Sequence, residues 1–311
     1  MIFFYIPVTI VFLLSSVWYL KNNYDSSNKN HTSFEFNTSQ SKDFNFDCGI
    51  RNLESESRII NGISSKPNRW PWIISIRAYD KLFNKLSSHH CGGSIINHNT
   101  ILTAAHCVYD LKGNNLAIIA GVNNIREKIK ISNLFYAKSV IYHENYSNVD
   151  FYKGVDIALI RLTKNLNFSK NIQPICLPPP GFNLEKIENK ALTLIGWGSI
   201  DGSSKTSSLA ENLQEANLKL LNYDPICSTH VSYNPTKLIC ALGQDQNLGS
   251  NACYGDSGGP LMKEINNTWY IVGVSSFIIT DDKSNCYPRA PSYHTQIASK
   301  LDWIHQALKK L

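Results

Sequence analysis

Beyond residue 62 the hydrophobic positions fall into short runs separated by turns rich in Gly, Pro, Asn and Ser. Such runs occupy residues 73–76, 93–96, 116–119, 157–160, 191–195 and 270–274. Many short strands at fairly regular spacing, with few helical patterns between them, are typical of β-sandwiches and β-barrels. The pattern therefore predicts an all-β domain.

The C-terminus carries a different pattern. Apolar residues recur there at four-three-four spacing, at Ile297, Leu301, Ile304 and Leu308. Residues at this spacing lie on one face of a helix, and the lysines of the segment lie off that face. We expect an amphipathic α-helix that caps the domain.

The N-terminus is distinct from the rest. Residues 1–20 contain no charged side chain, which fits a signal peptide and is just long enough for a membrane span. We favour a cleaved signal peptide and a secreted protein; a retained signal-anchor at the cell surface is the alternative. Residues 21–47 show no persistent periodicity, so they are interpreted as a flexible spacer that ends at Cys48.

Composition and charge exclude several classes of function. The 311 residues are 43% hydrophobic and 17% charged, as in a folded protein. The net charge of +6 is scattered, so no nucleic-acid surface is expected.

The eight cysteines form no C-x-x-C pair and no zinc spacing, so we expect no metal and no cofactor. Their even number and the apolar leader predict disulfides in an oxidising compartment. Glycosylation sequons at Asn30, Asn37, Asn145, Asn167 and Asn266 agree with that address.

One stretch of the chain has the composition of a reactive turn. Residues 254–261 read Y-G-D-S-G-G-P-L, with Ser257 between glycines. Glycine suits backbone with positive φ or close approach, so this turn exposes a hydroxyl beside consecutive N–H groups. Those groups make a candidate nucleophile and oxyanion site; the alternative is a plain glycine-rich surface turn.

Two other segments carry a candidate base and acid. His106 lies in T-A-A-H-C and its neighbour Cys107 is 16 positions after Cys91. A histidine beside a crosslink has a fixed backbone, which suits a general base. Asp156 leads directly into an apolar strand, where a carboxylate is costly unless it has a hydrogen-bonding partner.

The ordered motifs R-I-I-N-G, T-A-A-H-C, D-I-A-L-I-R-L, G-W-G and G-D-S-G-G-P-L resemble those of the chymotrypsin/trypsin-like serine proteases. The resemblance runs from about Cys48 to the C-terminus. It implies two six-stranded antiparallel β-barrels with a C-terminal α-helix and an active site between the barrels. The domains it implies are a propeptide at residues 21–58 and a serine protease domain at residues 59–311.

The same resemblance assigns roles in serine endopeptidase chemistry, which is this family's own mechanism. Ser257 would be the nucleophile, His106 the general base and Asp156 the residue that orients the imidazole. The N–H groups of Gly255 and Ser257 would form the oxyanion hole. Ser276 matches the serine that supports the aspartate and lines the substrate cleft.

Activation by proteolysis is also implied by the resemblance. Cleavage at Arg58–Ile59 would free an amine that pairs with Asp256, so the full chain would be a zymogen. The partners expected are protein or peptide substrates, an Arg-specific activating protease and macromolecular protease inhibitors. A catalytically inactive homologue that acts as a binding or regulatory module is the alternative function.

The family motifs further imply four disulfides, Cys48–Cys176, Cys91–Cys107, Cys227–Cys240 and Cys253–Cys286. The first would tether the propeptide as a light chain after activation. A further disulfide common in the family would need cysteines near Leu192 and Lys263, and both are absent.

Substrate preference is where the sequence departs from trypsin-like members. Asn251 stands at the pocket floor, where those members have an aspartate, and Ile278 and Ser292 stand at the pocket walls. A neutral amide does not compensate a buried cation. We therefore expect an uncharged P1 residue of small to medium size.

Overall fold

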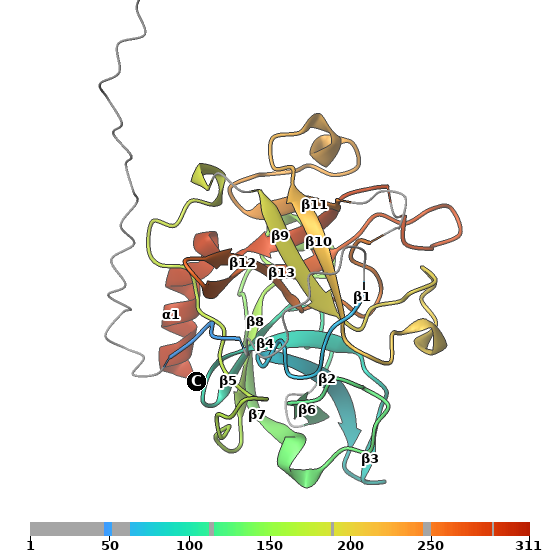
Figure 1. The fold of residues 1–311 in the computed structure, drawn as a ribbon, viewed down its shortest axis with the longest axis vertical. Coiled ribbons are helices and arrows are strands. Elements are labelled where there is room, and N and C mark those ends of the chain that lie inside the picture. The colour runs from blue at the N-terminus through green and yellow to red at the C-terminus, as the bar shows by residue number, and fades with distance from the viewer. Residues whose placement is uncertain (1–46, 52–62, 112–114, 188–189, 245–249, 288) are drawn as a thin grey trace, which may run out of the picture. The chain divides into compact units, whose positions relative to one another are not determined.

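The computed structural model describes residues 47–51, 63–111, 115–187, 190–244, 250–287 and 289–311 (Figure 1). They belong to one compact unit that spans Gln40–Leu311. The expected leader at 1–20 and the Arg58–Ile59 junction lie outside the described residues. Among the described residues, no helix is long and apolar enough to cross a membrane.

The first half of the domain forms an antiparallel barrel. Its strands are β2 (Ile73–Asp80), β4 (Cys91–Asn97), β5 (Thr100–Thr103), β6 (Leu116–Ala120), β7 (Leu134–Tyr142) and β8 (Ala158–Leu162). They pair in the order β2-β4-β5-β8-β7-β6, and β2 also pairs with β6, which closes the barrel. The short β3 (Lys85–Leu86) extends β2 as a hairpin.

The second half repeats this arrangement. Its strands are β9 (Ala191–Gly196), β10 (Gln214–Leu220), β11 (Leu238–Gly243), β12 (Pro260–Ile265), β13 (Thr268–Phe277) and β14 (Ser292–Gln296). The order is β10-β11-β14-β13-β12-β9, and β9 closes the barrel by pairing with β10. The short β1 (Ile63–Ser64) adds to the edge of β10. The expected fold of two six-stranded barrels is confirmed.

The hydrophobic runs of the sequence become these strands because the barrels are closed and packed. All five residues of β6 and all six residues of β11 are buried, so they appear in the sequence as nearly continuous apolar runs. The larger core includes Trp72, Ile74, Ile118 and Leu159, and it also takes in Met262 of β12. A second core fills the other barrel, around Leu194, Leu218, Ile239, Leu261 and Val272.

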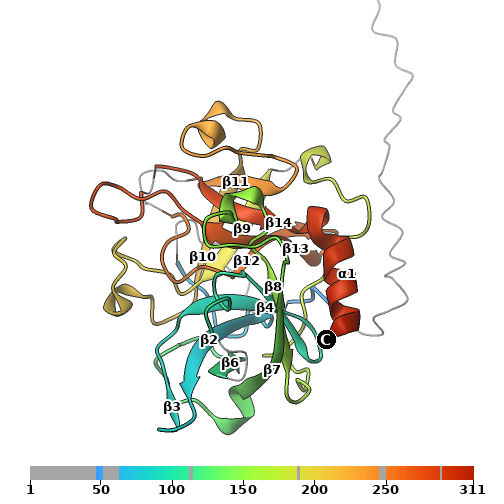
Figure 2. The same cartoon turned by 180° about the vertical axis from the view of Figure 1, so that it is seen from behind.

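The C-terminal helix is present, and its first turn is tighter than expected. Residues Ile297–Lys300 form a 3-10 helix, and α1 follows at Leu301–Lys310. The predicted stripe faces inward, with Leu301 and Ile304 buried. The Trp303 ring stacks on His143 at a centroid distance of 5.5 Å, so the helix is held against the segment after β7. Figure 2 shows α1 along the side of the two barrels.

Short 3-10 turns connect the strands elsewhere in the described chain. They are η2 (Ile131–Asn133), η3 (Phe151–Lys153), η4 (Leu184–Lys186), η5 (Thr206–Ser208) and η6 (Pro225–Ser228).

All eight cysteines are paired, in the disulfides Cys48–Cys176, Cys91–Cys107, Cys227–Cys240 and Cys253–Cys286. The first ties residues 47–51 to the domain. Gly49 strengthens this attachment, because its N–H donates to Pro174 and its carbonyl accepts from Trp269, at 2.8 and 2.9 Å. The Arg51 guanidinium also lies over the Trp269 ring, 5.2 Å from its centroid.

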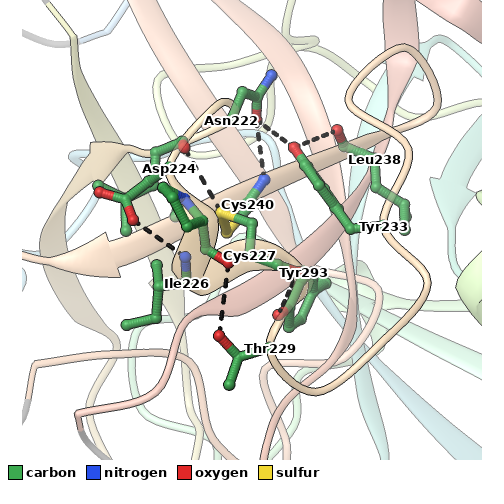
Figure 3. Close-up of a disulfide and its surroundings, with 12 residues drawn as sticks. Asn222, Asp224, Ile226, Cys227, Thr229, Tyr233, Leu238, Cys240 and Tyr293 are labelled. Atoms are coloured by element: carbon green, nitrogen blue, oxygen red, sulfur yellow. Dashed lines mark hydrogen bonds between the residues drawn. A yellow bond between two sulfur atoms is a disulfide. The ribbon is translucent and has the colours of Figure 1, made fainter.

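The Cys227–Cys240 disulfide joins η6 to β11 and is surrounded by hydrogen bonds (Figure 3). The backbone N–H of Cys240 donates to Asn222 Oδ1 at 3.0 Å, and the Tyr233 hydroxyl donates to the same oxygen at 2.7 Å. The Tyr293 hydroxyl donates to the carbonyl of Cys227 at 3.0 Å. This crosslink therefore fixes η6 beside β11 and β14.

Replacing both Cys227 and Cys240 by Ala is expected to lower the free energy of unfolding by about 3 kcal/mol. The reason is the entropy that the unfolded chain regains when a loop of this length is opened. Urea denaturation of the full chain measures the change. Thr229→Ala, an exposed change nearby, serves as control and should cost less than about 0.5 kcal/mol. An equal loss in the two proteins would contradict the prediction.

Candidate active site

The Asp156 carboxylate is fully buried just before β8, and it accepts three hydrogen bonds. The His106 backbone N–H donates to Oδ1 at 2.9 Å and the His106 ring Nδ1 lies 2.8 Å from Oδ2. The Ser276 hydroxyl donates to Oδ2 at 2.5 Å. A buried carboxylate is tolerated when its oxygens are satisfied in this way. The Asp156 carbonyl also accepts from Thr295 Oγ1, at 2.9 Å.

The His106 ring is oriented by this carboxylate. Because Asp156 accepts at Nδ1, the neutral ring carries its proton there and leaves Nε2 as an acceptor. Burial alone would lower the pKa of His106, but the charge of Asp156 and the hydrogen bond to it outweigh burial and raise the pKa. The Cys91–Cys107 disulfide fixes the adjacent backbone to β4. His106 is thus a base of enhanced strength with a fixed tautomer.

Ser257 is positioned through its backbone. Its carbonyl accepts from the Gly92 N–H of β4 at 2.8 Å, one residue from Cys91, so Ser257 is tied to the strand to which the Cys91–Cys107 disulfide fixes the segment of His106. The next N–H, of Gly258, donates to the Ser275 carbonyl at 2.8 Å. Ser257 Oγ makes no hydrogen bond within the described chain, His106 included. Such bonds often tighten only when substrate is bound.

Two N–H groups beside the serine are unpartnered. Among the described residues, the backbone N–H groups of Gly255 and Ser257 donate to nothing, and Gly255 has a φ of +97°. The Gly255 carbonyl lies 2.9 Å from Nε2 of His89, whose Nδ1 lies 2.8 Å from Ser75 Oγ. Burial lowers the pKa of His89 to about 4. A neutral, buried imidazole thus supports the turn that presents the two donors.

Asp256 is turned into the protein interior. Its carboxylate accepts from the N–H groups of Gly198 and Cys253 at 2.8 and 3.0 Å. Burial raises the pKa of Asp256 to about 6, although these two hydrogen bonds oppose the shift. No described cation forms an ion pair with it, so this carboxylate lacks charge compensation.

Comparison with known proteins agrees with this geometry. The family model described as Trypsin matches residues 59–304. The chain belongs to the trypsin family. A relative in the same comparison, ovochymase from Halocynthia roretzi, is 33% identical over 254 residues. That match covers 81% of this chain but only 15% of the relative, so the chain spans a small part of that protein.

A cavity of about 240 Å³ lies beside Ser257 of this trypsin-family chain. Of the pocket residues expected from the sequence, Ser276 and Ile278 line it. The rest of the lining consists of Ala252, Cys253, Tyr254, Asp256, Ser257, Ser275, Phe277, Thr280, Tyr293 and His294. The Cys253–Cys286 disulfide and a hydrogen bond from the Tyr254 hydroxyl to the Ser284 carbonyl, at 2.8 Å, join the loops around it.

Asn251 and Ser292, which the family resemblance places at the floor and wall of the substrate pocket, are not among the residues that line this cavity, and their part in substrate binding stays a prediction. The Asn251 side chain is used within the protein, since Nδ2 donates to the Ala290 carbonyl at 2.7 Å and Oδ1 accepts from Ala252 and Ser292. Ser292 in turn lies 3.0 Å from Nε2 of His294. Ser292 thus connects Asn251 to His294, which does line the cavity.

His294 and Ser275 are pocket residues that the sequence reasoning missed. The strand pattern held a usable signal: residues two apart in a strand point to the same face, so the expectation of Ser292 at a pocket wall also predicts His294 on that face. Ser275 lies next to Ser276, and its hydroxyl lies 3.2 Å from Nδ1 of His294. That contact joins β13 to β14 and cannot be read from either strand alone.

Within the described part of the chain, one group of side chains has metal-ligand spacing, namely Cys91, His106 and Cys107. Both cysteines are consumed by their mutual disulfide, and the His106 ring is committed to Asp156. The group therefore does not offer three ligands to an ion.

The His106 ring should titrate with a midpoint above the ordinary 6.5, and in the Asp156→Asn variant it should titrate below 6.5. Removing the charge leaves burial unopposed, and burial favours the neutral ring. NMR titration of the full chain measures both midpoints. Ser276→Ala keeps the charge of Asp156, so its midpoint should stay above 6.5. If the His106 midpoint is the same in Asp156→Asn as in the unsubstituted chain, Asp156 does not raise the pKa of His106 and the prediction is wrong.

Proposed function

We propose that this chain is a serine endopeptidase that cleaves peptide bonds through an acyl-enzyme. The observation that carries the proposal is the His106–Asp156 pair beside a serine turn with two unpartnered N–H groups. A base, its orienting acid and oxyanion donors around one hydroxyl are the requirements for acyl transfer. Protein and peptide substrates follow from the same chemistry.

Each residue has a role in this mechanism. Ser257 Oγ attacks the scissile carbonyl while His106 Nε2 takes its proton, and Asp156 stabilises the imidazolium that results. The N–H groups of Gly255 and Ser257 donate to the oxyanion of the tetrahedral intermediate. Losing one such donor typically costs about 3 kcal/mol of transition-state stabilisation. His106 then protonates the leaving amine, and water releases the acyl group by the same steps.

Activation is proposed to occur by cleavage at Arg58–Ile59, by a protease that cuts after arginine. The support is Asp256, a buried carboxylate with backbone donors but no cation among the described residues. The new amine at Ile59 would supply the missing positive charge and hold the oxyanion turn through the neighbouring Gly255. The Cys48–Cys176 disulfide would keep the cleaved N-terminal segment attached as a light chain.

Secretion is the proposed destination, through the apolar residues 1–20. Four disulfides support it, because they persist in oxidising compartments. The sequons at Asn145, Asn167 and Asn266 are exposed, as glycan acceptors must be. Macromolecular protease inhibitors of the same compartment are expected partners.

The proposed P1 preference is for an uncharged residue of small to medium size. The cavity lining carries one acidic side chain, Asp256, whose carboxylate is already bonded to Gly198 and Cys253. In the cleaved chain the Ile59 ammonium would already compensate Asp256, so a guanidinium or ammonium in the cavity would be buried without a counter-charge of its own. The branched side chain of Ile278 in the lining further reduces the room for a long P1 side chain. Dominant cleavage after Arg or Lys would contradict this preference.

An organofluorophosphonate should label Ser257 of the chain cleaved after Arg58 and should label the uncleaved chain poorly. The hydroxyl reacts only when His106 and the ordered oxyanion turn act together. Mass spectrometry of the labelled peptide gives the readout, with Ser257→Ala as the unlabelled control. Correctly cleaved, folded protein that takes no label would instead support the inactive binding module.

Cleavage after Arg58 should stabilise the chain more at pH 7 than at pH 4.5. In the uncleaved chain the raised pKa of Asp256, about 6, means that stability is lost as pH rises from about 4 through 6. Pairing with the Ile59 ammonium removes that loss, which is up to about 3 kcal/mol. Urea denaturation of both forms at the two pH values measures the difference.

Two variants control this comparison. Arg58→Gln blocks cleavage and should leave the protease-treated sample at the uncleaved stability. In Asp256→Ala the gain on cleavage should lose its pH dependence. A gain of equal size at both pH values in the unsubstituted chain would contradict the pairing.

A further inference from the structure

A chain of hydrogen-bonded side chains runs from the cavity into the second barrel. Ser275 Oγ lies 3.2 Å from His294 Nδ1, and His294 Nε2 lies 3.0 Å from Ser292 Oγ. Ser292 Oγ donates to Asn251 Oδ1 at 2.9 Å. We call these four residues the pocket relay. Its first two members, Ser275 and His294, line the cavity, and its last two lie outside the lining.

The imidazole of the relay is neutral. His294 has no exposed surface, its ring nitrogens face only hydroxyl groups, and no carboxylate is bonded to the relay within the described chain. Burial lowers its pKa to about 3. A neutral imidazole has one donor and one acceptor nitrogen, so each adjoining hydroxyl must complement it.

Two hydrogen arrangements satisfy the relay. When Ser292 donates to Asn251, His294 Nε2 donates to Ser292 and Nδ1 accepts from Ser275, which leaves the Ser275 oxygen as an acceptor toward the cavity. When Ser292 donates to Nε2, Nδ1 donates to Ser275, and the Ser275 hydroxyl hydrogen is available to the cavity. Ser275, a residue of the cavity lining, thus has a hydroxyl that can serve in either role.

We propose that the pocket relay makes this site selective for a P1 side chain that ends in a carboxamide, Asn or Gln. The inference rests on the proposed endopeptidase function and names the substrate class of its pocket. A carboxamide carries both a donor and an acceptor on one group, so it matches Ser275 in either arrangement by rotating its end.

The same pocket discriminates against isosteres of the carboxamides. An aliphatic P1 side chain of equal size would remove water from Ser275 and return no hydrogen bond. An acidic side chain would bury a negative charge beside a neutral imidazole, and a basic one would bury a positive charge. Hydrogen-bonded recognition of this kind distinguishes substrates that differ little in shape.

Matched substrates test the proposal on the full chain cleaved after Arg58. All peptides share one sequence and differ only at P1. The first set carries Asn, Leu or Asp there, the second carries Gln, Met or Glu, and two further peptides carry Arg or Lys. We expect kcat/KM for the better carboxamide to exceed that of both isosteres about tenfold, the factor that one hydrogen bond supplies. Equal kcat/KM for the carboxamide peptide and its aliphatic isostere, or a higher kcat/KM for the acidic peptide, would overturn the proposal.

Variants connect the preference to the relay. Ser275→Ala removes the hydroxyl that faces the cavity, and His294→Phe removes the relay nitrogens; each should bring the carboxamide-to-aliphatic ratio close to one. Ser275→Ala deletes a single oxygen and keeps the Ser275 backbone bonds to Gly258 and Gly259, so it remains informative if His294→Phe does not fold. Thr280→Val removes a lining hydroxyl outside the relay and should keep the ratio. Loss of the ratio only in Thr280→Val would overturn the assignment.

Failure of the inference and failure of the proposed function give different results. If the chain is labelled at Ser257 and cleaves peptides without preferring carboxamides, the proposed role of the pocket relay is wrong and the proposed endopeptidase function stands. If the cleaved, folded chain takes no label and hydrolyses no peptide, both proposals are wrong, since the relay is then not a substrate site.

Discussion

The buried carboxylate of Asp156 is the group on which the rest of the site depends. It has no exposed surface, so it is tolerated only because His106 and Ser276 satisfy its oxygens. His106 follows β5 of the first barrel and Ser276 lies in β13 of the second, while Thr295 of β14 holds the Asp156 carbonyl. The acid therefore links both barrels. The first barrel supplies the histidine and its acid, and the second barrel holds that acid through Ser276 and Thr295, so contacts from both barrels set the geometry of the site.

Glycines allow the barrels to approach closely enough for this contact. A Cβ added to Gly92 would lie 3.1 Å from the Cα of Gly259. One added to Gly258, whose φ is +75°, would lie 2.6 Å from the Gly92 carbonyl oxygen. Backbone therefore meets backbone where β4 passes the serine turn, and the Gly92–Ser257 hydrogen bond forms there. The glycines of G-D-S-G-G serve this approach as well as the donor groups they expose.

Sequence reasoning predicted what is encoded locally. The strand runs, the helical stripe and the motifs around His106 and Ser257 each lie within a few residues, so the pattern that forms them is visible in one segment. The pocket was less predictable, because its polar side chains contact one another between two strands, β13 and β14. The family resemblance placed Asn251 at the pocket floor, which stays a prediction. The hydrogen bonds of its side chain to Ala290 and Ser292 are tertiary contacts that no spacing reveals. The Arg58–Ile59 junction stays a prediction.

Two buried titratable groups near the serine turn, Asp256 and His294, differ in the charge that their surroundings can stabilise. Burial raises the pKa of Asp256 and lowers that of His294, so in each case it disfavours the charged form. Asp256, however, accepts two backbone N–H bonds that stabilise its carboxylate, and an incoming cation would complete its surroundings. His294 faces hydroxyl groups, which adapt to a neutral ring and give a charge little support. Burial thus favours a charge pair at Asp256 and neutral hydrogen bonding at His294, because the donors around each group differ.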